Sequence, residues 1–287
     1  MNQANGKGIF YALVATALFS VTAVLAKIAV ADYHVLQILF FRQVVVFLSS
    51  VPTLIQTYPD SLKTHHVGTH AWRLIGAFIA LSFSIWAVAV LPLTTAVTLS
   101  FAQTFFVAIL AALLLNEIVG PHRIAAIIAG FIGVVIVMRP GLGSFVNIYT
   151  LIPLTGALGA AVAVVAVRKL TRTESTTTLL LYQSVFVGLL AGIPLLWLWI
   201  TPDIKGLILL LSMGLLAAAG QWIGIAALRH GEASVVSMIK YTDLLFVAVL
   251  GFVLFSEVPE KSTILGASII VLSTIYLFKR ENRSKNN

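Results

Sequence analysis

The stretch QTFFVAILAALLLNE at residues 103–117 decides the fold, because it returns as DLLFVAVLGFVLFSE at residues 243–257. The two copies stand 140 residues apart, and each ends on a glutamate, Glu117 or Glu257. The same offset, without a gap, pairs residues elsewhere in the chain: Ala17-Leu18 with Ala157-Leu158, Ala23-Val24 with Ala163-Val164, Gln43 with Gln183, and Ala87 with Ala227. Polar matches weigh most, since the alternative explanation, shared apolar composition, also produces matches. We therefore predict an internal duplication over nearly the whole chain.

The composition is that of a membrane protein. Of the 287 residues, 60% are hydrophobic and only 10% are charged, and the mean hydropathy is +1.04. These values lie far outside the range of soluble domains. The chain has no cysteine, so disulfides and thiolate metal sites are excluded. The net charge of +8 comes from basic residues beside apolar segments, which indicates membrane topology rather than nucleic-acid binding.

Ten transmembrane helices are predicted from the apolar windows, since about 20 apolar residues cross a bilayer. They lie at residues 8–30, 35–56, 72–91, 94–115, 122–138, 147–167, 177–199, 206–226, 233–255 and 262–278. The first is about twice as long as the apolar region of a signal peptide and has a counterpart in the second half, so we expect it to be retained. The expected fold class is an all-α integral membrane protein in which residues 1–145 and 146–287 form two five-helix repeats of one membrane domain.

The positive charges predict the orientation. Of the 18 Lys and Arg residues, twelve, Arg73 among them, fall on the side of the two termini. Four fall on the opposite side: Lys27, Arg139, Lys205 and Lys261. The remaining two, Arg42 and Lys240, lie inside predicted spans. This bias places both termini in the cytoplasm.

An odd number of spans in each repeat makes the second copy enter the membrane from the opposite face. The two repeats are then inverted, and inverted repeats can rock about a site near the midplane so that the site opens to each side in turn. This arrangement is typical of a carrier.

The sequence resembles the EamA-type branch of the drug/metabolite transporter superfamily over nearly its whole length. The resemblance is carried by Phe41-Arg42-Gln43, Leu91-Pro92-Leu93, Asn116-Glu117, Gly130-Phe131-Ile132-Gly133-Val134, Met138-Arg139-Pro140-Gly141 and Phe255-Ser256-Glu257. It implies ten helices in two five-helix repeats, and a cargo such as an amino acid, nucleotide, vitamin or drug, moved in or out. The chain departs from many relatives by having Gln103-Thr104 and Asp243-Leu244 where those relatives carry a proline.

Lys240, Tyr241 and Asp243 form the first candidate site. A charged side chain at the bilayer centre costs about 2.5–3.5 kcal/mol on insertion scales, so a charge inside a span is a functional candidate. A spacing of three places Lys240 and Asp243 on one helical face, where they can pair. In the functional interpretation Lys240 attracts an anionic group, while Asp243 binds a cationic group or exchanges a proton. The alternative is a structural ion pair.

Other polar and aromatic residues inside the spans are further candidates for substrate binding. Gln103 is the repeat mate of Asp243. The aromatic pair Gln221-Trp222 and Trp86 lie away from the interfacial belt, so they either wall a cavity for a planar or apolar ligand or pack against neighbours. For Arg42, near the outer end of its span, we favour packing or topology, with substrate contact as the alternative.

Two further features predict structure rather than chemistry. Glu117 and Glu257 stand at matching span ends, where helix capping or an interfacial position is favoured. Gln43 and Gln183 are expected to hydrogen-bond between helices. Small residues give the span at 147–167 a narrow face that favours close packing: Gly156, Gly159, Ala160 and Ala163.

The sequence contains no set of catalytic residues. Paired carboxylates, metal-binding histidine spacings, Ser-His-Asp sets and phosphate loops are missing, and all six His lie in or beside predicted connections. We expect neither an enzyme nor a cofactor. The predicted function is secondary-active or exchange transport of a small polar, zwitterionic or anionic metabolite, amino-acid-like or vitamin-like, at a site between the third, fourth, eighth and ninth spans. Protons are a candidate coupling ion through Asp243. The alternative on the same fold is a drug exporter or lipid translocator. The expected location is a bacterial inner membrane, as a monomer or homodimer.

Overall fold

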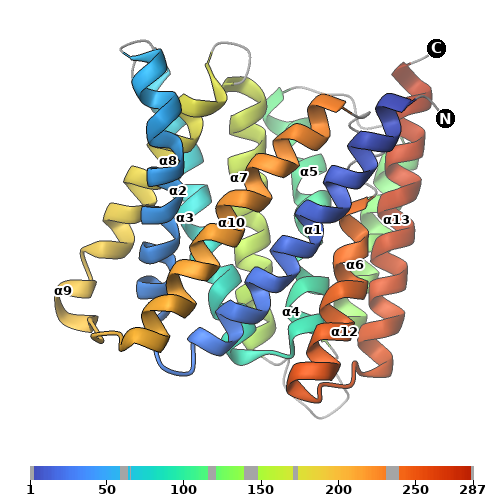
Figure 1. The fold of residues 1–287 in the computed structure, drawn as a ribbon. Coiled ribbons are helices and arrows are strands. Elements are labelled where there is room, and N and C mark those ends of the chain that lie inside the picture. Colours follow the sequence, from blue (N-terminus) through green and yellow to red (C-terminus); the bar gives the residue numbers. More distant parts are fainter. Residues whose placement is uncertain are drawn as a thin grey trace.

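A computed structural model describes residues 3–58, 64, 66–115, 121–138, 148–170, 174–230 and 239–285, and these residues contain helices and no strands (Figure 1). The helices of the first half are α1 (Gln3–Ala29), α2 (Val35–Thr57), α3 (Val67–Val90), α4 (Leu93–Ser100), α5 (Gln103–Leu115) and α6 (Pro121–Met138). Those of the second half are η2 (Ile148–Thr150), α7 (Leu151–Leu170), α8 (Thr176–Gly192), α9 (Leu195–Leu198), α10 (Ile204–His230), η3 (Lys240–Thr242), α12 (Asp243–Phe255) and α13 (Lys261–Lys285).

Many of these helices suit a bilayer. Within the described residues, six segments are long and apolar enough to cross a membrane: Lys7–Ala29, Val35–Thr57, Val67–Val90, Leu93–Leu110, Ile148–Val167 and Ile204–Gly224. Shorter apolar helices cover Ile127–Met138, Thr177–Gly192, Asp243–Phe255 and Lys261–Ser273. Large apolar side chains such as Leu215, Val249 and Phe252 remain exposed, as expected of a surface that faces lipid. The chain is a multi-pass, all-helical membrane protein, and the count of ten spans stays a prediction.

The structure corrects the expected start of the third span. The helix begins at Val67 rather than at 72, so Arg73 lies inside α3 and is only 2% exposed. His70 also lies inside α3 and is buried, although it was expected in a connection. Both polar residues were mistaken for loop residues because hydropathy alone marks the end of a helix at its first charges.

The predicted span 94–115 is broken between α4 and α5. Phe101 and Ala102 form a turn in which the N–H groups of both residues donate to carbonyls three residues back, those of Thr98 and Leu99, at 3.2 and 3.1 Å. Short 3₁₀ turns inside a helix often mark functional hinges. In the second half the 3₁₀ helix η3 precedes α12, and α5 and α12 both begin and end 140 residues apart. The break thus recurs at the position of the repeat, without a proline.

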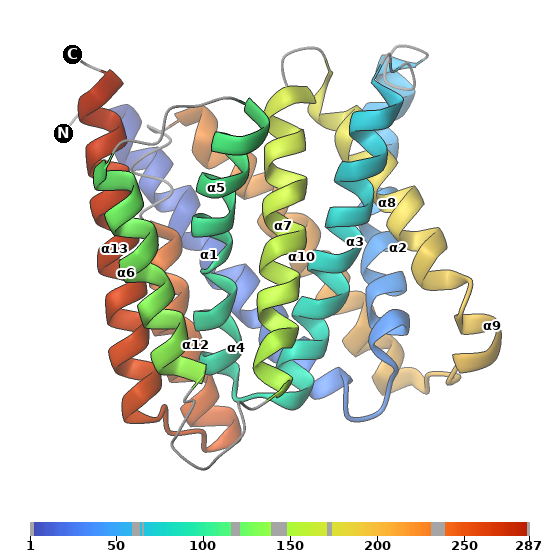
Figure 2. The same ribbon diagram turned by 180° about the vertical axis from the view of Figure 1, so that it is seen from behind.

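Helices of the two halves pack against each other in pairs. The most extensive contacts join α3 to α7, α1 to α10, α6 to α13 and α2 to α8 (Figures 1 and 2). The predicted narrow face is confirmed on α7, where Gly159 lies directly against Gly76 of α3. Small residues permit this approach of two backbones. The two chain ends lie together at one end of the bundle (Figure 1).

Candidate functional site

A cavity of about 570 Å³ lies between α1, α8, α10 and the η3–α12 junction. Its polar lining consists of Thr16, Gln183, Gln221, Lys240 and Asp243. The rest of the wall is apolar or small and includes Ala12, Ala15, Phe19, Phe101, Leu180, Gly220, Gly224 and Ala227. The size and the few polar groups in an apolar wall fit a small-molecule site.

The cavity occupies the half of the bundle that contains the termini. It is lined by the first half of α1 and the last turns of α10, which reach that end (Figure 1). Towards the opposite end the same helices are closed by packed side chains. Val24 of α1, Met213 of α10 and Val247 of α12 belong to the buried apolar core there. The cavity is therefore closed on one side of the bundle.

Asp243 is held at the cavity wall by α1. The Ser20 hydroxyl donates a short hydrogen bond to the Asp243 carboxylate, and Ser20 Oγ also lies 3.0 Å from the carbonyl oxygen of Thr16. A hydroxyl has one proton to donate and two lone pairs to accept with. Ser20 can therefore donate to an ionised Asp243, or accept from a protonated Asp243 while it donates to the Thr16 carbonyl. Both protonation states of the carboxyl group keep a partner.

Lys240 faces the same cavity from the turn that precedes α12. Its side chain is exposed and lines the cavity, whereas Asp243 is half-buried. Both residues are described by the structure, and no direct ion pair of 4.0 Å or less joins them. The expected Lys240–Asp243 pair is thus not formed, because Asp243 bonds to Ser20 instead. The cavity presents a separate cation and a separate anion.

A buried network supports Gln183 from behind. Arg73 of α3 donates to the side-chain oxygen of Gln183 at 3.5 Å and to the carbonyl of Leu179 at 2.9 Å. Because a guanidinium group can only donate, the Gln183 oxygen faces Arg73 and its amide NH₂ is left for the cavity. Near Arg73, His70 Nε2 lies 2.5 Å from Glu174 Oε2.

Comparison with known proteins places the sequence in a family. The family described as "EamA-like transporter family" matches residues 6–139 and, separately, residues 147–279. The chain belongs to the EamA-like transporter family. This transporter is 27% identical to the S-adenosylmethionine uptake transporter of Rickettsia prowazekii, over 98% of this chain and 95% of that protein. It is 29% identical to the pseudopaline exporter of Pseudomonas aeruginosa, over 94% and 95%. It is 30% identical to a riboflavin transporter of Vibrio cholerae, over 95% and 87%.

The fold of this EamA-like transporter also occurs among solved structures. A crystal structure of a protein described without a function has a TM-score of 0.67 and 16% identity, covering 97% of this chain and 99% of that one. The likeness shows the fold alone. From the family and these relatives, the chain is a transporter of small metabolites in a membrane and not an enzyme.

The residues expected to bind substrate divide into two groups in this EamA-like transporter. Lys240, Asp243 and Gln221 line the cavity together. Gln103, Trp86, Trp222 and Arg42 are described by the structure but lie outside the lining, and the side chain of Tyr241 lies outside the described residues.

Packing accounts for the two tryptophans. Trp86 is 43% exposed and packs on Phe83 of its own helix, with ring centroids 5.5 Å apart. Trp222 is 36% exposed, and its indole N–H donates to Ser49 Oγ at 3.5 Å. Their positions inside spans reflect aromatic surface that packs in or faces the bilayer.

Arg42 and Gln43 lie on α2, away from the cavity lining. Within the described part of the chain, buried Arg42 Nε and Gln43 Nε2 have no hydrogen-bond partner. The expected interhelical hydrogen bond of Gln183 is present through Arg73, while the Gln43 amide nitrogen makes none.

Sequence reasoning missed Ser20, Thr16 and Arg73 as parts of the site. Ser20 and Thr16 carried no signal beyond a spacing of four on one helix. For Arg73 a signal existed, since His70 and Arg73 are three residues apart and therefore share a helix face if α3 starts earlier.

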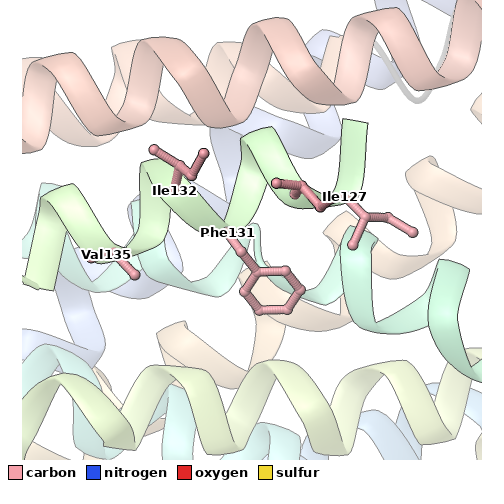
Figure 3. A pocket seen from close by; sticks show the side chains of 5 residues that line it. Ile127, Phe131, Ile132 and Val135 are labelled. Carbon is pink, nitrogen blue, oxygen red and sulfur yellow. The ribbon is translucent and has the colours of Figure 1, made fainter. Parts of the chain in front are cut away.

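A second hollow of about 340 Å³ runs along α6 and differs in chemistry. Figure 3 shows Ile127, Phe131, Ile132 and Val135 around it, and Ile128 completes the lining. All five side chains are apolar, and Ile128 and Ile132 are more than half exposed on this helix. Such a groove suits lipid chains and offers nothing to orient a polar metabolite. The substrate site of this transporter is therefore sought in the cavity of Lys240 and Asp243.

Proposed function

We propose that this protein carries a small zwitterionic metabolite across a bacterial inner membrane by alternating access, with the metabolite bound in the cavity at Lys240 and Asp243. One observation carries the proposal: a single cavity is lined by one cationic and one anionic side chain that do not pair with each other, together with two amides, Gln183 and Gln221.

The charges of the lining favour a substrate with both an anionic and a cationic group. Separate charges in a poorly solvated site are costly unless each finds a partner. A carboxylate on the substrate meets Lys240 and the Gln183 NH₂ that faces away from Arg73. An ammonium or sulfonium group meets Asp243. An electrically neutral zwitterion satisfies both ends and leaves no uncompensated charge.

The transport mechanism rests on two inverted five-helix repeats, residues 1–145 and 146–287, which together make ten spans. Three observations support this organisation. The family matches the chain twice, once in each half. Both halves break a helix at equivalent positions, before Gln103 and before Asp243. The main helix contacts join the halves reciprocally: α1 with α10 and α3 with α7, α2 with α8, α6 with α13. Repeats related in this way rock about a site between them.

The proposed orientation has both termini in the cytoplasm. Arg73 is buried inside α3 and Lys27 is bound in an ion pair, so neither reports on topology. Without them the bias of Lys and Arg changes from twelve against four to eleven against three, which still obeys the positive-inside rule. The cavity, which lies at the end of the termini, then faces the cytoplasm in this conformation.

Proton coupling is assigned to Asp243. It is the only carboxylate in the cavity lining of the described residues. Ser20 keeps a hydrogen-bond partner for the carboxyl group whether or not it carries a proton. A group that is satisfied in both states can exchange a proton without a large penalty.

The relatives support a small-metabolite cargo and leave the direction to experiment. One is named for uptake of S-adenosylmethionine and another for export of pseudopaline. Export of a drug and lipid translocation are the alternative functions on this fold, and the same assay separates them.

The test is a ligand screen followed by transport. Purified protein is heated with amino acids, S-adenosylmethionine, riboflavin, simple anions and simple cations, because a ligand that binds the folded state raises the unfolding temperature. We expect the zwitterions to give the largest shift, and the best of them to be taken up or exported by proteoliposomes, faster with a pH gradient. Asp243→Asn and Lys240→Ala should abolish both the shift and transport.

Matched controls separate the site from general effects of charge. Asp32→Asn and Lys205→Ala make the same chemical changes at exposed residues outside the cavity, and both should transport normally. Full transport by Asp243→Asn and Lys240→Ala would remove this site, and selective stabilisation by lipids or apolar drugs would replace the proposed cargo.

A further inference from the structure

A charged cluster lies at the end of the bundle opposite the cavity. Lys27, in the last turn of α1, forms an ion pair with Glu257, which follows α12, and the two side chains are only 17% and 18% exposed. The Lys27 ammonium lies 5.3 Å from the centre of the Phe255 ring. It also donates to the carbonyl of Leu91 at 3.1 Å. Glu257 Oε2 accepts from the N–H of Leu93 at 2.7 Å. One cluster therefore joins α1, the α3–α4 connection and α12.

We propose that Lys27 and Glu257 are the gate that keeps the transport cavity closed on the side opposite the termini. This inference rests on the proposed alternating-access function and names the contact that must break when the carrier turns over. It assigns to Lys27 a role other than the topology signal that the sequence predicts.

The backbone around Glu257 is built to aim its carboxylate at the gate. Ser256 ends α12 in the left-handed conformation, with φ of 55°. The N–H of Glu257 then donates to the Gly251 carbonyl at 3.1 Å, so the chain folds back under the helix. Gly251 leaves room for the side chain, because a Cβ there would lie 3.4 Å from Glu257 Oε2. Left-handed residues that end helices are usually glycine, so a serine here is an uncommon choice.

Glu257 also supplies a cap that α4 lacks. The first N–H groups of a helix need an acceptor, and the residue before α4 is Pro92, whose side chain cannot accept. Glu257 caps this helix from the other half of the chain. The capping role predicted for Glu257 is thus present, although on α4 rather than on the next helix. When the gate opens, the Leu93 N–H and the Leu91 carbonyl lose their partners and need water. An aqueous vestibule on that side would provide it.

The gate is present on one side only. In the repeat, Glu257 corresponds to Glu117, but Lys27 corresponds to Val167, which cannot form an ion pair. The structure describes Val167 as part of α7 and does not describe Glu117. A latch on one side of an otherwise repeated architecture biases the resting state toward the conformation observed here, with the opposite side closed. Removing one partner leaves a poorly solvated charge without its counterion, which destabilises the closed arrangement.

The absence of cysteine from the chain permits a direct test. A single Thr16→Cys substitution places a thiol on the cavity wall. The thiol is labelled with a membrane-impermeant maleimide in spheroplasts and in inside-out vesicles, and a protease-sensitive C-terminal tag identifies the side of the termini. In this parent we expect fast labelling from the side of the termini and slow labelling from the opposite side.

Gate variants should change the slow rate. Lys27→Ala and Glu257→Gln should raise labelling from the side opposite the termini by at least about tenfold, since each removes one charge of a buried pair. The exchange Lys27→Glu with Glu257→Lys should restore slow labelling. Lys205→Ala, an exposed lysine in the first turn of α10, is the matched control and should not change it. Glu257→Gln keeps an acceptor for the Leu93 N–H, so it remains informative if Lys27→Ala does not fold.

The outcomes separate the gate from the function on which it rests. Parent-like slow labelling in a folded Glu257→Gln variant, with the parent labelled from the side of the termini, overturns the gate and leaves the carrier intact. A parent labelled from neither side, or equally from both, overturns the proposed cavity and the gate together.

Discussion

Replacing Gly76 with alanine should loosen the contact between α3 and α7, which joins the two halves of the chain. A Cβ at position 76 would lie 2.7 Å from the carbonyl oxygen of Gly159 and 3.1 Å from the backbone nitrogen of Ala163. Carbon atoms ordinarily stand about 3.5–4.0 Å from their neighbours, so the two helices must separate by roughly 0.5–1 Å. Backbone atoms cannot turn away as a flexible side chain can. A gap of that size removes a quarter to a half of the dispersion attraction along the contact, and overpacking of this kind costs about 1–3 kcal/mol.

Gly68 provides a control on the same helix. No atom lies within 4 Å of a Cβ built there. Both glycine-to-alanine changes gain the same helix propensity, about 1 kcal/mol, so the difference between the two variants isolates the packing term. We expect Gly76→Ala to be less stable than Gly68→Ala by about 1–3 kcal/mol.

The assay is unfolding of the detergent-solubilised protein, followed by its tryptophan fluorescence during heating or titration with a denaturing detergent. Gly159→Ala should behave like Gly76→Ala, because its Cβ would lie 2.8 Å from the Gly76 carbonyl oxygen. Equal stability of the Gly76→Ala and Gly68→Ala variants would refute the packing argument.

Three further predictions concern single polar residues. Arg73→Ala deletes two interhelical hydrogen bonds and leaves a buried carboxylate neighbour without its cation. It should therefore lower the free energy of unfolding by about 3–5 kcal/mol, with Arg73→Lys intermediate; an unchanged melting temperature would contradict this. Ser256→Gly removes the cost of a left-handed side chain, so the protein should gain up to about 1–2 kcal/mol in the same assay, and a loss would show that the serine has another role. Ser20→Ala removes the hydrogen bond to Asp243 and should slow transport about tenfold or more, whereas Ser212→Ala, whose hydroxyl bonds only within its own helix, should transport at the parent rate.

Local composition carried much of the fold into the prediction. Hydropathy over windows of about 20 residues is a property of neighbouring residues, so the membrane class and the approximate positions of the helices followed from it. The small face of α7 was predicted for the same reason, since helical spacing alone brings Gly156, Gly159 and Ala163 to one side. Lys240 and Asp243 were found because charges are rare within apolar spans, and the structure brings both to one cavity with Gln221.

Helix ends were predicted less well, because a charge near the interface lowers hydropathy whether or not the helix continues. The first turns of α3 were read as a connection, and Arg73 was therefore counted as a loop charge. The break between Phe101 and Ala102 was also missed, since the surrounding residues are uniformly apolar and no proline marks it.

The sequence by itself determined that this chain is helical, lies in a membrane and repeats itself at 140 residues, since these properties arise from composition and spacing along the chain. Tertiary structure alone decided which polar groups meet. Ser20 finds Asp243 223 positions away, and Lys27 finds Glu257 230 positions away. A lysine at the end of a helix serves equally well as an interfacial charge or as half of an ion pair, and only the packing of distant helices brings the partner that distinguishes them.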